Sequence, residues 1–220
     1  MLRRVIAFFD PAQPGFARRL LRLARWGLAL VILLLAAGAW GLLRLPQGRY
    51  WWGVAQLGLG FPAAAVRTAS SAIEDGLATR YGFYRLLAAG QRRSGQVEAQ
   101  LQTFDQAVLK FPTDWLAQGH RCWYGSLYDR APEVLDSCDA AVRLAPPDEA
   151  DPWAWRATAK ALSGDLDAAA DDLRAALRIW DENGAWGSRY VEQRRRWLRQ
   201  VEEGQNPFDQ ETLERLRSAF

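Results

Sequence analysis

The sequence predicts an all-α protein, in which one transmembrane helix precedes an α-solenoid of about three helical hairpins with capping helices. Two observations predict it: an uncharged, mainly apolar run near the N-terminus, and a set of residues that recurs every 34 or 35 positions from residue 81 onward. One hairpin cannot bury its apolar face, whereas stacked hairpins bury a continuous core. The stack is therefore expected to form the body of the protein.

The uncharged run extends over 18 residues, from Trp26 to Leu43. A helix of that length spans roughly 27 Å at about 1.5 Å per residue, close to the ~30 Å hydrocarbon core of a bilayer. The small residues at 37–39 leave a cleaved signal peptide as the alternative. The long segment ahead of the run, and the apolar residues that follow Ala39, favour an uncleaved anchor in contact with lipid.

The charge distribution predicts the orientation of this anchor. Residues 1–50 hold eight arginines and one acidic residue, a net charge of +7, whereas residues 51–220 have a net charge of −4. Most of the arginines precede the span, so the positive-inside rule leaves the N-terminus in the cytoplasm. We expect a single-pass protein of the bacterial inner membrane with a periplasmic body. Residues 1–25 form a basic amphipathic head, and the mildly acidic body argues against a nucleic-acid partner.

The recurring residues mark paired helices. Ala107 and Pro112 have the same spacing as Ala141 and Pro146, and the two pairs are 34 residues apart. Apolar residues at helical spacing accompany them. The pattern resembles the tetratricopeptide repeat (TPR) family, whose units each pair two antiparallel helices. The residues of the best-matching unit are Trp153, Ala157, Gly164, Leu166, Ala169, Leu173, Ala176 and Leu177.

The resemblance divides the body into three repeats with flanking segments. The repeats are 81–114, 115–149 and 150–183, within residues 81–183. The middle repeat departs from the pattern, because no glycine separates its helices and Pro132 starts the second one. Residues 62–80 and 184–220 are expected to be capping helices, the last a short lid that ends at Phe220. Residues 44–61 are either a linker or an entry helix.

The first helix of each repeat lines the concave side in the TPR family, which implies a candidate groove. The register assigns to it Arg85, Arg92 and Arg93 from the first repeat, Trp123 from the second, and Ala154 and Thr158 from the third. Guanidinium groups pair with carboxylates, so such a groove suits an acidic or carboxylate-bearing peptide. A solvated face with structural tryptophans is the alternative. A solvated helix side is likewise expected for the basic run Arg194–Arg196, where acidic residues are interspersed.

The two cysteines, Cys122 and Cys138, both belong to the middle repeat. The register places them between its paired helices, where they are either buried free thiols or, in an oxidising compartment, a disulfide. The closed loop of about 16 residues would contribute on the order of 3 kcal/mol. His120 lies near Cys122, but these residues lack the number and spacing of ligands in a structural zinc site, so no metal is expected.

No nucleophile motif, phosphate-binding glycine loop or metalloprotease motif occurs, so we expect neither an enzyme nor a cofactor or small-molecule substrate. The predicted function is a membrane-anchored scaffold or adaptor that mediates protein–protein interaction or complex assembly. One alternative is a small structural subunit of a large membrane protein complex. Another is a chaperone-like assembly factor for an envelope protein or enzyme.

Overall fold

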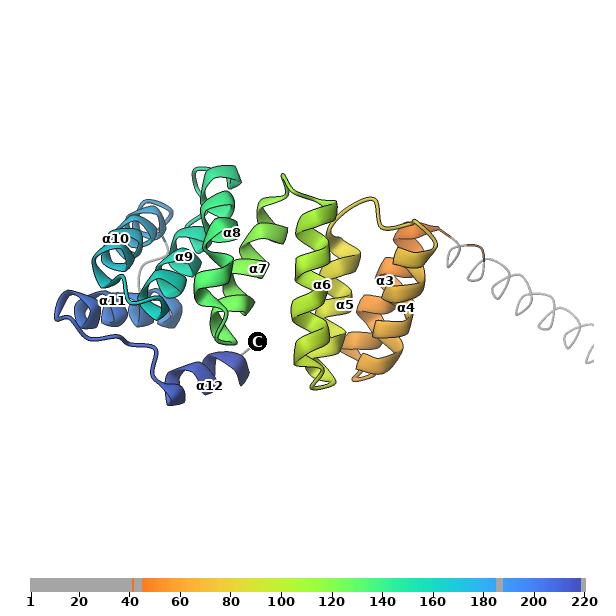
Figure 1. The fold of residues 1–220 in the computed structure, drawn as a ribbon. Coiled ribbons are helices and arrows are strands. Elements are labelled where there is room, and N and C mark those ends of the chain that lie inside the picture. The colour runs from red at the N-terminus through yellow and green to blue at the C-terminus, as the bar shows by residue number, and fades with distance from the viewer. Residues whose placement is uncertain (1–40, 42–44, 185–187, 219–220) are drawn as a thin grey trace, which may run out of the picture. The chain divides into compact units, whose positions relative to one another are not determined.

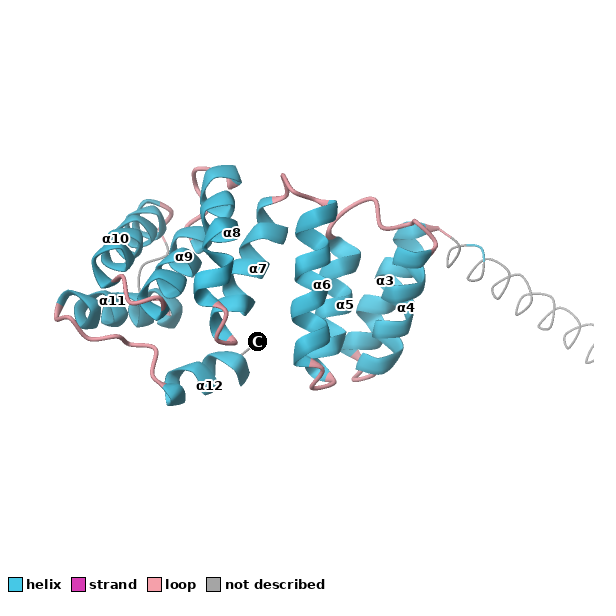
Figure 2. Cartoon of the chain, in the orientation of Figure 1, coloured by secondary structure: helices cyan, strands magenta, loops and turns pink. Residues whose placement is uncertain are grey.

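The computed structural model describes Gly41, residues 45–184 and residues 188–218. These residues form ten α-helices and no strand (Figure 2). The chain divides into two compact units, of which the first ends at Trp52 and the second begins at Gly53. The predicted head at 1–25 and, apart from Gly41, the predicted span at 26–43 lie outside the described residues. Among the described helices, none has the length and apolar character that crossing a membrane requires.

Within the described residues, two helices precede the repeats. Helix α3 (Pro46–Gly58) covers most of residues 44–61, so this segment is largely helical. Helix α4 (Pro62–Glu74) starts at Pro62, where the missing N–H costs no helical hydrogen bond. Ala65, Ala69 and Ala72 of α4 are fully buried. Their small side chains allow α4 to pack closely against α5.

Each of the three predicted repeats contains two helices (Figure 1). The first repeat has α5 (Gly82–Arg93) and α6 (Val97–Lys110), the second α7 (Trp115–Leu127) and α8 (Ala131–Leu144), and the third α9 (Asp151–Leu162) and α10 (Leu166–Glu182). The two helices of a repeat pack against each other, and α7 also contacts α9 of the next repeat. Ala107, Ala141 and Ala176 are fully buried where the helices meet.

Two further helices follow the repeats, in the segment expected to cap the stack. Helix α11 (Arg189–Glu202) packs against α10, and α12 (Gln210–Ser218) returns to α7. Arg217 of α12 donates a 2.6 Å hydrogen bond from Nε to the carbonyl oxygen of Leu127, at the C-terminal end of α7. This contact satisfies a carbonyl that the helix itself leaves without a partner. Phe220 lies outside the described residues.

Ion pairs connect the repeats through two equivalent arginines, Arg121 of α7 and Arg156 of α9. Arg121 contacts Asp105 of α6 at 2.8 Å and also Asp136 of α8. Arg156 contacts Asp139 of α8 at 2.8 Å and Asp172 of α10 at 2.7 Å. Each arginine thus joins its own helix to one before it and one after it.

The turns between the paired helices need a left-handed backbone. Gly95 and Gly164 supply it in the first and third repeats, with φ of 71° and 90°. In the middle repeat the equivalent residue is Asp129, with φ of 63°, the one non-glycine residue of positive φ in the described ranges. The repeat that lacks the glycine therefore keeps the same turn geometry, but the side chain of Asp129 adds the steric cost of a left-handed conformation.

We predict that Asp129→Gly raises the free energy of unfolding by about 0.5–1 kcal/mol, because glycine adopts this conformation without steric cost. The carboxylate that is lost is largely exposed and lies 3.5 Å from Arg217, a pairing of little energetic value. Urea denaturation followed by circular dichroism measures the change. The matched control, Gly164→Ala, should lower stability by about 1 kcal/mol. A destabilising Asp129→Gly would contradict this account of the turn.

Candidate functional site

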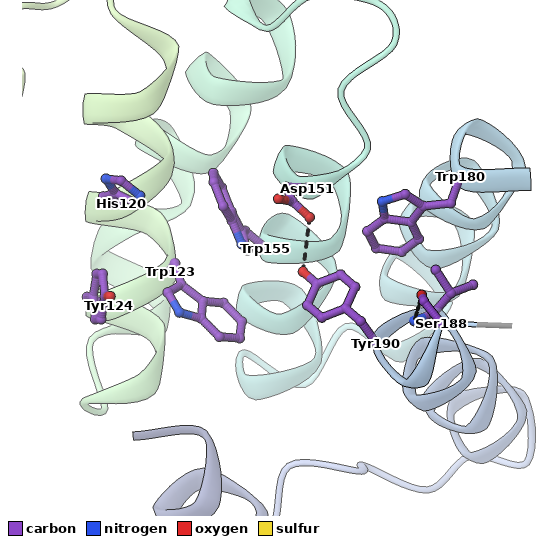
Figure 3. Close-up of a pocket in the computed structure, with 9 residues that line it drawn as sticks. His120, Trp123, Tyr124, Asp151, Trp155, Trp180, Ser188 and Tyr190 are labelled. Atoms are coloured by element: carbon purple, nitrogen blue, oxygen red, sulfur yellow. Dashed lines mark hydrogen bonds between the residues drawn. The ribbon is translucent and has the colours of Figure 1, made fainter. Parts of the chain in front are cut away.

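A pocket of about 380 Å³ opens between α7, α9 and α11, with α10 at its side (Figure 3). Six of its nine lining residues carry aromatic or imidazole rings: His120, Trp123, Tyr124, Trp155, Trp180 and Tyr190. The remaining three are Asp151, Ser188 and Val191. A concave, ring-lined space of this volume with a few polar groups has the usual properties of a ligand site.

Helix α7 contributes the imidazole of His120, which is packed among rings. The Tyr81 hydroxyl and His120 Nδ1 share a hydrogen bond. The centroid of the imidazole lies 5.8 Å from that of Trp155 and 6.1 Å from that of Tyr124. Burial, together with the positive charge of Arg85, lowers the pKa of His120 from 6.5 to about 4. His120 is therefore neutral at pH 7.

Helix α9 contributes Trp155, whose position depends on a glycine of α7. A Cβ atom at Gly119 would overlap the Trp155 ring, so only glycine allows the indole to lie directly against α7. The ring of Trp115, also from α7, stacks on Trp155 with centroids 6.4 Å apart. The indole is thereby held between the two helices, with 9% of the residue exposed.

Helix α11 contributes Tyr190, which points back toward α9 (Figure 3). Its hydroxyl donates a 3.0 Å hydrogen bond to Oδ1 of Asp151 at the start of α9. Burial raises the pKa of Tyr190 well above its ordinary value, so the hydroxyl remains a donor. The Trp180 ring meets Tyr190 edge-on, with centroids 5.3 Å apart. Ser188 caps α11 by accepting the Val191 N–H at 3.2 Å.

Arg194 of α11 lies against Tyr190 but does not line the pocket. Its guanidinium is 3.4 Å from the ring centroid of Tyr190 and 4.6 Å from that of Trp197. The residue is only 1% exposed, and no ion pair with a carboxylate is found for it in the described part of the chain. Burial lowers its pKa. The expectation of a solvated basic run is therefore wrong for Arg194, because aromatic faces cover the cation.

The six predicted groove residues fall in different environments. Trp123 lines the pocket. Burial raises the pKa of Tyr124, and the positive charge of Arg92 opposes this shift. The positive charge of Arg85 acts in the same direction as the burial that lowers the pKa of His120. Arg93 instead donates a 2.6 Å hydrogen bond to the carbonyl oxygen of Leu57, at the end of α3.

Thr158 does not belong to a groove. It is fully buried, and its hydroxyl donates a 3.0 Å hydrogen bond to the carbonyl oxygen of Ala154, which is itself 2% exposed. The predicted register chose the wrong side of α9, because Trp155, one residue beyond Ala154, is the residue that reaches the pocket. One position along a helix rotates a side chain by about 100°.

Sequence reasoning also missed Asp151, Trp180 and Tyr190. A constant repeat length of 35 residues identifies some of the residues at the pocket. Four residues lie at this interval: Arg85, His120, Trp155 and Tyr190. The last three line the pocket, and Arg85 lies close enough to influence His120. Tyr190 belongs to α11, beyond the three predicted repeats, so the inner face continues into the capping segment.

Cys122 of α7 and Cys138 of α8 form a disulfide with a Cα–Cα distance of 4.9 Å. Both residues are fully buried. The bond joins the two helices of the middle repeat and leaves neither thiol to bind a metal ion. Over the described residues, no group of three or more histidine, cysteine or acidic side chains is arranged to hold a metal.

Comparison with known proteins supports the fold. No family model matches the chain, and no curated protein does. The solved structure described as "MamA RS-1 ArsTM double mutant" is similar, with a TM-score of 0.55 and 14% identity over 80% of this chain and 97% of that chain. "MamA 41-end from Desulfovibrio magneticus RS-1" aligns with a TM-score of 0.55 and 13% identity, over 73% and 97%.

MamA is a TPR-like helical protein, so the predicted TPR-like, all-helical architecture is confirmed. At 13–14% identity the similarity concerns the fold alone. The pocket is therefore interpreted from its own residues.

We predict that replacing both cysteines by alanine lowers the free energy of unfolding by about 3 kcal/mol, because the 16-residue loop is no longer closed in the unfolded chain. Urea denaturation measures the loss, and the reduced wild-type protein should match the double variant. Without a reductant, neither thiol of the denatured wild type should react with an alkylating agent. Alkylation of both thiols under that condition would rule the disulfide out.

We predict that His120 makes stability decline as pH falls from about 6.5 to 4. Its pKa in the folded protein, about 4, lies below the ordinary 6.5, so the unfolded chain binds the proton first. The full loss would be about 3 kcal/mol. His120→Gln should remove this contribution, so the stability difference between variant and wild type should change between pH 7 and pH 4.5. Parallel pH profiles of the two proteins would contradict the prediction.

Proposed function

We propose that the protein is a membrane-anchored TPR-type scaffold that binds a protein partner in the pocket between α7, α9 and α11. The observation that carries this proposal is the ring-lined pocket on the inner face of a TPR-like stack. Aromatic side chains supply large, rigid contact areas and are enriched at the energetic centres of protein interfaces.

The polar side chains around the pocket support a non-covalent role. Ser188 caps α11, Tyr190 engages the Asp151 carboxylate, and neutral His120 shares a hydrogen bond with Tyr81. Each of these groups thus has a structural partner. Their arrangement fixes the shape of the pocket, which is what recognition of a partner requires.

The anchor and the location are proposed from the sequence. The span at Trp26–Leu43 and its flanking arginines support a single-pass inner-membrane protein with the stack in the periplasm. The disulfide supports the same location, because such bonds persist in oxidising compartments.

A small subunit of a large membrane protein complex is a second candidate, because several large apolar side chains are exposed on the second unit. Leu59 is 70% exposed, Phe61 61% and Leu109 83%. Such side chains are buried when a neighbouring subunit covers them. In this case the protein should co-purify in mild detergent with other subunits at a fixed ratio, whereas an adaptor should elute free or at a low, variable ratio.

Site-specific photo-crosslinking in cells tests the pocket as the binding site. We expect benzoylphenylalanine at Trp180, which keeps an aromatic ring in the pocket wall, to yield discrete protein adducts on irradiation. The matched control is the same photoprobe at Arg178, an exposed position on the same helix that does not line the pocket. Adducts at neither position, or equally at both, would argue against the pocket as the docking site.

A further inference from the structure

The charge inside the pocket is negative. Of the nine lining residues, Asp151 is the only one with a charged side chain at neutral pH, because burial keeps His120 uncharged. The Tyr190 hydroxyl donates a hydrogen bond to Oδ1 of Asp151. This hydrogen bond fixes the position of the carboxylate at the pocket wall. The arginines assigned to the groove from the sequence are not among the lining residues, so the reason for expecting an acidic ligand does not apply to this pocket.

The lining rings suit a cation as well. The faces of tryptophan and tyrosine rings carry the negative part of the ring quadrupole and attract ammonium and guanidinium groups. Trp123, Trp155 and Tyr190 approach the same space from three different helices (Figure 3). A cationic group in this space would lie near these rings and the Asp151 carboxylate together.

The same wall already stabilises one cation. The Arg194 guanidinium is buried against Tyr190 and Trp197, and no ion pair is found for it among the described residues. Its Nη1 also donates hydrogen bonds to Oε1 of Gln193 at 2.8 Å and to the carbonyl oxygen of Tyr190 at 3.4 Å. Ring faces and neutral oxygen acceptors together thus accommodate a guanidinium in this part of the protein. Arg194 repels a second cation, and Asp151, with the opposite charge and a place in the pocket lining, offsets that repulsion.

We propose that the pocket binds the cationic head of a lysine or arginine side chain on the partner. This inference rests on the proposed function and specifies the chemistry that the partner presents.

Three small probes of similar size and different charge test the inference: n-butylammonium, n-butanol and butyrate. Each is titrated into the full chain in detergent, and the indole N–H signals of the tryptophans are followed by NMR. We expect n-butylammonium to shift the signals of Trp155 and Trp180 with a half-saturating concentration about tenfold below those of the other two probes. Asp151→Asn keeps an oxygen that can accept the Tyr190 hydrogen bond and should abolish this preference.

The matched control is Asp167→Asn, which removes an exposed carboxylate from the first turn of α10 and should leave the preference intact. Equal affinity for n-butylammonium and n-butanol, tighter binding of butyrate, or no binding of n-butylammonium would each overturn the inference. The crosslinking at Trp180 does not depend on the charge of the ligand. Adducts there without a preference for n-butylammonium would thus refute only the cationic ligand and leave the docking site in place.

Discussion

The contact between Trp155 and Gly119 is the constraint on which the candidate site depends. Since α7 has no side chain at Gly119, the indole of α9 lies directly against the α7 backbone. This contact fixes the separation of the two helices and places a large ring at the centre of the inner face. Tyr190 of α11 then donates a hydrogen bond to Asp151 of α9, and this bond positions α11 against α9. The site is thus a product of helix packing.

The repeat architecture could be predicted from the sequence because its determinants are local and periodic. Ala107, Ala141 and Ala176 are small where paired helices touch, and all three are fully buried. The site was harder to predict, because it depends on which side of each helix faces inward. Choosing Ala154 and Thr158 rather than Trp155 was an error of one to three positions, and it moved the predicted groove to buried residues.

Long-range contacts explain the other differences between sequence and structure. Acidic residues near Arg194–Arg196 suggested a solvated helix side, yet Arg194 is enclosed by two rings. Tyr190 and Trp197 are four positions before and three positions after Arg194, so they share its side of α11. Arg93, which the register assigns to the groove, donates a 2.6 Å hydrogen bond to the carbonyl oxygen of Leu57 at the end of another helix. Such pairings depend on the tertiary arrangement, which local patterns leave open.

The return of α12 to α7 changes how this repeat protein should unfold. An open array of repeats loses its terminal units first, because each end has only one neighbour. Here the hydrogen bond from Arg217 to Leu127 joins residues 90 positions apart, so the terminal helix is attached to the middle of the array. The segment from α7 to α12 should therefore melt as one cooperative block rather than fray from its C-terminal end. A tag or fusion partner placed directly after α12 would disturb the second repeat.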